Sequence, residues 1–226
     1  MFYFYDPTFL ILIPALLLTI YAQYKVHSTA KKFSDVKNSS GLTGKEVAQK
    51  ILQQEGLGDM PINKSTKKLG DHYDPKKREL TLSEEVYGKA SIAALGIAAH
   101  EVGHAIQHEK KYPFLVFRTA FYPLASFSSY LAPFLFIAGF IFALQSLIQI
   151  GIVLFAASVV FTVITLPVEF NASKRAVAKV TNMGIVTTEE IGGVKKVLNA
   201  AALTYVAAAL VALLQLIRLV LIAGRE

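Results

Sequence analysis

The residue types most able to do chemistry stand together in one stretch, His100-Glu101-Val102-Gly103-His104. Residues four positions apart share one face of a helix, so the imidazoles of His100 and His104 can bind one metal ion. Glu101 can then take a proton from a water at that metal. The chain has no cysteine, so a metal must be held by His, Asp or Glu. The pattern predicts metal-assisted hydrolysis, and the alternative is two histidines packed in a helical core.

A catalytic zinc site usually has three protein ligands, so one more must come from elsewhere in the chain. Glu169 is the favoured candidate, because it ends a charge-free run (119–168) and the predicted topology brings it to the same membrane face as the histidines. It could instead pair with a nearby cation at the membrane surface. The other candidates are Glu109, at a poor spacing on the same helix, and Glu189 and Glu190, at an expected helix start.

Hydrolysis at a carbonyl also needs a group that stabilises the oxyanion of the transition state, a role that a His or Tyr can fill. His72 and Tyr73, within the segment DHYDP, are the leading candidates, and Tyr205 is a third. The same segment is equally typical of an ordinary turn. The remaining histidines, His27 and His108, lack the ligand spacing of the motif and are expected at the surface.

Three elements outside the membrane are expected to position these groups. Thr43 and Glu46 have the spacing of a capping box, which predicts a short amphipathic helix within 41–58. Alternation over 78–82, with charges on one face, predicts an edge strand that could bind substrate by strand addition. The Ala-rich segment 87–109 is too short and too polar to cross a membrane, so we expect a buried helix that carries the motif.

Composition and charge-free runs indicate a membrane protein. Hydrophobic residues make up 54% of the 226 positions and charged residues only 17%, too few to cover a soluble globule. One helix over the run 119–168 would be about 75 Å long, more than twice a hydrocarbon core of ~30 Å, so the run must fold back once. The polar cluster at 145–149 is the expected hairpin. The predicted spans are 7–24, 121–144, 147–167 and 200–222.

The basic residues predict the orientation. Of the 23 lysines and arginines, 16 lie between positions 25 and 118 and five between 174 and 196. With four spans both segments lie on one side, which the positive-inside rule makes cytoplasmic. The lysines that follow the first span suit anionic lipid headgroups of the bilayer, and nucleic-acid binding is not expected.

The expected fold is therefore a mainly α, polytopic membrane protein with about four transmembrane helices and a small α+β cytoplasmic domain. Its segments are an N-terminal transmembrane anchor (1–24), a cytoplasmic domain with the metal-binding helix (25–118), a transmembrane hairpin (119–168), a cytoplasmic segment with the third ligand (169–199) and a C-terminal transmembrane helix (200–226).

The stretches SIAALGIAAHEVGHAIQ, DHYDP, PVEFNASKRA and ALTYVAAAL together resemble the YugP-type membrane zinc metallopeptidases of bacteria and archaea. The resemblance covers nearly the whole chain. It implies a zincin-like domain of the gluzincin type, in which a downstream helical Glu completes the site. It further implies one Zn²⁺ per chain, held by His100, His104 and Glu169, with Glu101 as general base.

Two positions depart from the pattern of related proteins. Relatives favour Asp where this chain has Asn171, and other membrane gluzincins carry Asp where it has Ser173. If that acid orients a ligand, an amide or a hydroxyl must do so here, and metal affinity is the property that would change.

The sequence thus predicts a zinc metalloendopeptidase of the plasma membrane that cleaves peptides or membrane proteins on the cytoplasmic side. A catalytically silent membrane scaffold that keeps the helix for packing is the alternative, which an intact motif disfavours. A metal transporter is disfavoured because the predicted spans carry no buried acid or histidine of their own.

Overall fold

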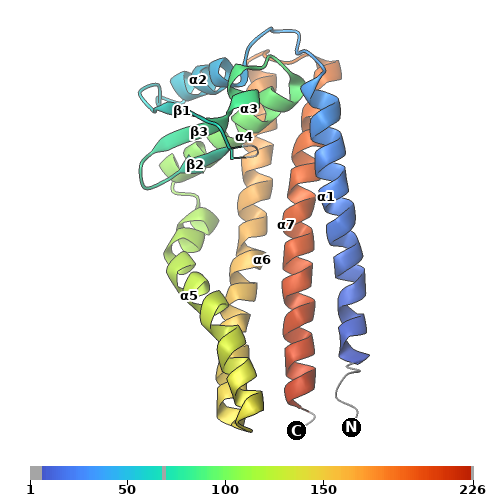
Figure 1. Ribbon diagram of the computed structural model, residues 1–226. Helices are drawn as coiled ribbons and strands as arrows, with labels where there is room; N and C mark the ends of the chain where they lie inside the picture. The colour runs from blue at the N-terminus through green and yellow to red at the C-terminus, as the bar shows by residue number, and fades with distance from the viewer. Residues whose placement is uncertain (1–6, 68–69, 225–226) are drawn as a thin grey trace. The chain divides into compact units, whose positions relative to one another are not determined.

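The computed structural model describes residues 7–67 and 70–224, and it is mainly helical (Figure 1). A short 3₁₀ helix precedes α1. The elements are η1 (Pro7–Leu12), α1 (Ile13–Ser34), α2 (Gly44–Gln54), β1 (Ile62–Ser65), β2 (His72–Asp74), β3 (Glu79–Ser83), α3 (Glu84–Gly88), α4 (Ile92–Glu109), α5 (Pro113–Ile141), α6 (Gln145–Asn182) and α7 (Thr188–Ala223). The expected fold class, mainly α with about four apolar spans and a small α+β part, is confirmed by the long apolar helices and one small mixed sheet.

The chain forms two compact units. The apolar unit comprises residues 1–23, 116–167 and 203–226, and the polar unit comprises residues 24–115 and 168–202. The division falls inside α1, α5, α6 and α7. Each of these helices therefore contributes one part to each unit.

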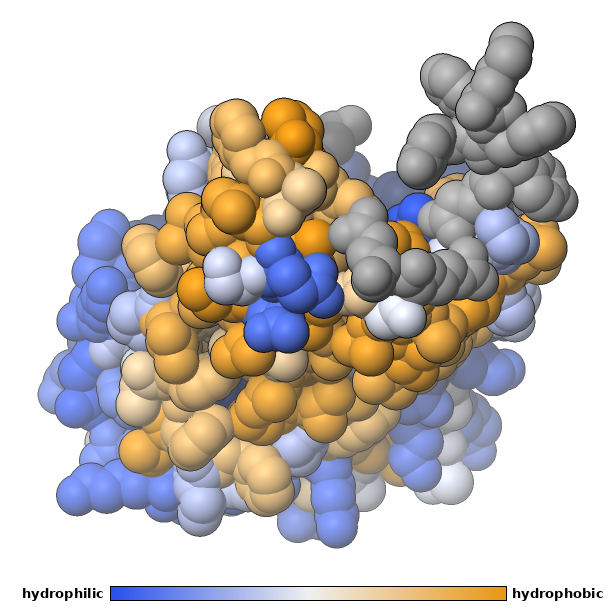
Figure 2. All heavy atoms as spheres, turned by 90° about the horizontal axis from the view of Figure 1, so that it is seen from below, coloured by the Kyte–Doolittle hydropathy of each residue, from blue (hydrophilic) through white to orange (hydrophobic). Residues whose placement is uncertain are grey.

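Within residues 7–67 and 70–224, four helices are long and apolar enough to cross a membrane, as the sequence predicted: Pro7–Ser34, Pro113–Ile141, Gln145–Asn182 and Thr188–Ala223. Large apolar side chains of the apolar unit, such as Phe134, Ile141 and Val153, are exposed. In the view of Figure 2 such side chains cover much of the near surface. A surface of this kind is stable against lipid tails and unfavourable against water.

Helices α5 and α6 pack closely in the apolar unit because small residues lie between them. A Cβ added at Gly151 would lie 3.0 Å from the backbone nitrogen of Phe136. The turn between the two helices lies just before Gln145, with Ala143 at a positive φ of 51°, and not inside the polar cluster 145–149 as predicted. Those polar residues instead begin α6.

The sheet of the polar unit has the strand order β1-β3-β2, with β1 parallel and β2 antiparallel to β3. Strand β3 therefore lies in the centre, and the prediction that 78–82 forms an edge strand is wrong. Leu80 and Leu82 are fully buried, and Glu79 is held beside β1 by a hydrogen bond from Asn63 of 3.0 Å. An alternating pattern shows which face is buried, but it does not show whether a strand's backbone is paired on one side or both.

The core of the polar unit is built on α2 and α4. The capping box of α2 is present, with the Thr43 hydroxyl accepting from the backbone of Glu46 and the Glu46 carboxylate accepting from the backbone of Thr43. This fixes the helix start and presents Val47 and Ile51 to the core. Helix α4 begins at Ile92, later than the predicted 87, because Ser91 caps it. Figure 1 shows α2, α3 and α4 grouped with the sheet.

Candidate metal centre

The two histidines of the motif lie one turn apart on α4, and Glu169 lies on α6 within the same polar unit. Oε2 of Glu169 is 3.3 Å from Nε2 of His100 and 3.6 Å from Nε2 of His104. One ligand atom from each residue lies within 4.8 Å of the other two. The side chain of Glu169 is only 4% exposed. The structure therefore brings together the three residues that the sequence singled out as metal ligands.

Close contact between the helices α4 and α6 makes this meeting possible. A Cβ added at Gly103 would lie 2.6 Å from the backbone oxygen of Ala172, closer than real Cβ atoms approach. Gly103 stands inside the motif, and Ala172 lies one turn beyond Glu169. The glycine thus lets the backbone of α6 come near enough for its carboxylate to reach the histidines.

A buried amide holds His104. Oε1 of Gln107 lies 3.0 Å from Nδ1 of His104, and Nε2 of Gln107 donates to the backbone oxygen of Val168 at 2.8 Å. Because a carbonyl oxygen can only accept, the amide nitrogen must face Val168 and the amide oxygen must face the histidine. Nδ1 of His104 therefore carries a hydrogen. In the neutral ring the lone pair then lies on Nε2, the atom nearest Glu169.

Ser173 and Asn171, the two positions noted above, both contribute to this support. Ser173 Oγ lies 3.1 Å from Nδ1 of His100, so a hydroxyl orients this ring. Asn171 does not contact a ligand directly: its Oδ1 accepts from Gln107 Nε2 at 3.0 Å and from Arg175 Nε at 2.7 Å. Sequence reasoning missed Gln107, whose signal is an amide at a fully buried helical position three residues after His104.

Charge around His104 favours its protonated form in the absence of metal. Burial by itself lowers the pKa of His104, but the hydrogen bond with Glu169 and the negative charge of the buried Glu101 outweigh it, so the pKa of His104 is raised. A site that attracts a proton in this way also attracts a metal cation, which competes with the proton for the same nitrogen.

The alternative third ligands are engaged elsewhere. Glu109 pairs with Arg78 at 2.6 Å. Glu190 accepts from the backbone nitrogen of Ser39 at 2.5 Å and from that of Thr187 at 2.9 Å, at the start of α7. Glu189 lies beside it in the first turn of the same helix. These contacts leave Glu169 as the carboxylate that meets the two histidines among the residues described.

The candidate oxyanion donors lie in different surroundings. Tyr73 Oη is 2.7 Å from Nδ1 of His108, which is half-buried on α4 and not at the surface as predicted. His72 is exposed, and its Nδ1 lies 2.7 Å from the backbone oxygen of Gly70. Tyr205 is exposed in the apolar unit. The expected turn after β2 is present, since Asp74 Oδ1 accepts from the backbone nitrogens of the next residues.

Two imidazole nitrogens and one carboxylate oxygen form the donor set of a catalytic zinc site that leaves a fourth position open. The donors fit, because the second ring nitrogen of each histidine is already held by Ser173 or Gln107 and the nitrogens that remain converge on Glu169. Such a site suits hydrolysis at a polarised carbonyl.

Comparison with known proteins agrees with this geometry. Residues 8–224 match the family described as "Putative neutral zinc metallopeptidase", and the chain belongs to that family of peptide hydrolases. It is also 50% identical over 210 residues to "Putative membrane protease YugP" of Bacillus subtilis strain 168, covering 93% of each chain. The resemblance that the motifs indicated is thus confirmed. No solved structure matches.

Proposed function

We propose that this zinc metallopeptidase is a membrane-bound endopeptidase that holds one zinc ion per chain on His100, His104 and Glu169. The observation that carries the proposal is the convergence of two histidine Nε2 atoms on one buried carboxylate oxygen. A helix that served only for packing would not need an ionisable cluster in its core, where unpaired charge is costly.

Zinc bound there would supply Lewis-acid chemistry, polarising the substrate carbonyl and making water more acidic. Glu101 is the proposed general base: its carboxylate takes the proton from the attacking water and passes it to the leaving amine. It is suited to this role because it is buried on α4 and its charge acts on His104. The helix and its packing fix the carboxylate, so little reorganisation is needed during the reaction.

Tyr73 is the favoured second donor to the substrate oxyanion. Its hydroxyl is held against α4 by His108, one turn beyond the ligand His104. If His108 donates from Nδ1 to this hydroxyl, the phenolic hydrogen is left for a substrate oxygen. His72 is less suitable because its ring is exposed and binds the chain near its own position.

The basic residues of the polar unit favour a cytoplasmic location for the site, with peptides or membrane proteins of the plasma membrane as substrates. If all four candidate spans cross the membrane, residues 25–118 and 169–199 lie on one side, and those segments hold most of the lysines and arginines.

The test is to purify the protein in detergent, measure zinc by elemental analysis, and assay cleavage of a fluorogenic peptide library. Glu101→Gln should keep about one zinc per chain and lose cleavage by roughly two to four orders of magnitude, because a proton acceptor is removed and no ligand. Glu169→Gln should lose both zinc and cleavage. Glu109→Gln, an exposed change on the same helix, is the matched control. A zinc-loaded wild-type protein that cleaves nothing in the library would favour the silent scaffold.

A further inference from the structure

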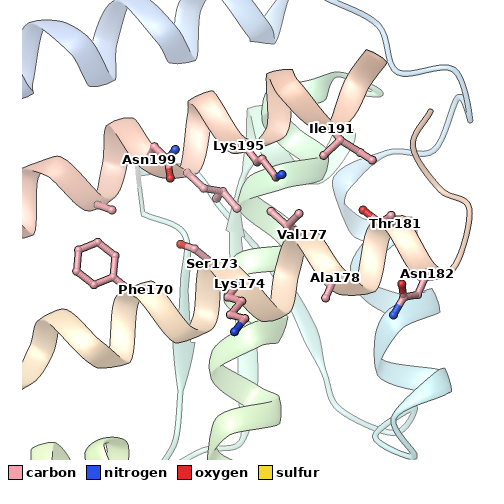
Figure 3. A pocket seen from close by; sticks show the side chains of 12 residues that line it. Phe170, Ser173, Lys174, Val177, Ala178, Thr181, Asn182, Ile191, Lys195 and Asn199 are labelled. Atoms are coloured by element: carbon pink, nitrogen blue, oxygen red, sulfur yellow. The ribbon is translucent and has the colours of Figure 1, made fainter. Parts of the chain in front are cut away.

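A groove of about 560 Å³ lies between α6 and α7 in the polar unit (Figure 3). Val177 and Ser173 of α6 face Lys195 and Ile191 of α7 across it. The mechanism proposed above makes no use of this groove.

The groove carries positive charge without a compensating acid. Lys174 and Lys195 line it, and none of its lining residues is Asp or Glu. Among the interactions that the structure describes, neither lysine takes part in an ion pair, in contrast to Lys179 on α6, which pairs with Glu55. Asn199 and Thr181 add neutral hydrogen-bonding groups. A ligand that fits this charge is an anion such as a phosphate ester.

One end of the groove is apolar. Phe170, Leu198 and Ala202 line it. Phe170 lies two residues after the charge-free run 119–168, and Leu198 and Ala202 lie inside the charge-free run 197–217. The groove thus changes from cationic to apolar toward the parts of α6 and α7 that belong to the membrane spans. A free phosphate ion would have no use for the apolar end.

Peptide substrate is a poor match for this groove because the groove lies behind His100. Ser173 lines the groove and contacts Nδ1 of His100, whereas the nitrogen that faces Glu169 is Nε2, on the other edge of the ring. A substrate must reach the Nε2 side to be cleaved. The groove is therefore a separate site.

We propose that this groove binds an anionic phospholipid, with its phosphate at Lys195 and the start of an acyl chain against Phe170, Leu198 and Ala202. Basic pockets between membrane helices on the cytoplasmic side are suited to such headgroups. The proposal uses the membrane topology and does not depend on zinc chemistry, so it can fail or hold independently of the proposed peptidase mechanism.

Native mass spectrometry of the detergent-solubilised protein with a short-chain phosphatidylglycerol tests this. Lys195→Gln should weaken binding about five-fold, because a cation near a membrane surface contributes about that factor. Lys174→Gln should weaken it less, because the Lys174 side chain extends from the side of α6 away from α7. Lys196→Gln removes the same charge at the adjacent exposed position, which does not line the groove. It should leave affinity unchanged within two-fold. Zinc content of all variants reports on the fold of the polar unit.

Two further ligands test whether binding needs both the charge of the headgroup and the acyl chain. Phosphatidylcholine of the same chain length should bind at least ten-fold more weakly, because its headgroup has no net charge, and glycerol 3-phosphate should bind weakly, because it leaves the apolar end unused. Equal loss of lipid in the Lys196 and Lys195 variants would overturn the proposal in favour of diffuse surface attraction. Glycerol 3-phosphate binding as tightly as the lipid would overturn it in favour of a soluble phosphate ester.

Discussion

The amide oxygen of Gln107 lies 3.0 Å from Nδ1 of His104, and its amide nitrogen reaches both Val168 and Asn171 on α6. One fully buried side chain therefore joins a ligand on α4 to the segment of α6 that carries Glu169. It does two things at once: it fixes the tautomer of His104, and it ties α4 to α6 beside the three candidate ligands.

Gln107→Leu tests this link. Leucine fills a similar volume but leaves the Val168 oxygen and the His104 ring without this partner, so zinc affinity should fall about 10–100-fold. Competition with a calibrated zinc chelator measures the affinity directly, without an activity assay. Gln54→Leu on the exposed face of α2 is the matched control. Wild-type affinity in the Gln107 variant would show that the ring is held well enough without the amide.

The contact at Gly103 predicts a steric effect on the site. Gly103→Ala places a methyl group 2.6 Å from the Ala172 oxygen, so α4 and α6 must separate. Zinc content should therefore fall, and the free energy of unfolding should fall by roughly 1–3 kcal/mol. The control is Gly192→Ala on α7, where an added Cβ meets nothing within 4 Å. That change should raise stability by up to about 1 kcal/mol, because alanine favours a helix. Opposite shifts in melting temperature are the expected result, and a Gly103 variant as stable as wild type would argue against the close contact.

Glu55 predicts a pH dependence of stability. Hydrogen bonding from Lys179 lowers the pKa of Glu55, and Lys110 at 3.1 Å lowers it further. The pKa of Glu55 is lower in the folded state than in the unfolded state, so its interactions with the two lysines stabilise the fold above the usual glutamate pKa. This stabilisation is lost as the pH falls through the folded-state pKa. Glu55→Gln should cost about 1 kcal/mol at pH 7 and have a smaller effect in acid. Unfolding followed by circular dichroism at both pH values measures the difference, and equal destabilisation at the two would contradict an electrostatic origin.

The four-span topology predicts which residues are accessible from each side of the membrane. The chain has no cysteine, so single cysteines at Lys37 and Lys196 can be labelled with an impermeant maleimide. Neither should react in intact cells, and both should react after permeabilisation. A cysteine at the exposed Leu144, between α5 and α6, should react in intact cells and serves as the positive control. Labelling at positions 37 and 196 in intact cells would contradict the proposed orientation.

Local patterns predicted those features that depend on a single stretch of chain. The capping box at Thr43 and Glu46 fixed a helix start, because both partners lie within one turn. The apolar spans follow from the length of charge-free runs, since a helix in lipid satisfies its own backbone hydrogen bonds. The pairing of His100 with His104 follows from helical periodicity alone.

Features that depend on packing between distant segments were not predictable in this way. The central position of β3 is set by partners on both sides, β1 and β2, and an alternating sequence looks the same in the centre and at the edge of such a sheet. His108 was expected at the surface, but β2 brings Tyr73 against it. Nothing near His108 in the sequence signals this contact.

The candidate metal centre depends both on a local sequence pattern and on packing between distant segments. Residue types and the spacing of four predicted by themselves that one helix carries two candidate ligands and a potential base, because helical geometry fixes where those side chains point. The sequence could only rank carboxylates for the third ligand. The tertiary structure brings Glu169 to the two histidines, because Gly103 lets α6 approach, and it holds Glu109 and Glu190 with other partners. It also decided that Gln107 supports His104, since that role depends on a carbonyl oxygen 61 residues away in the chain.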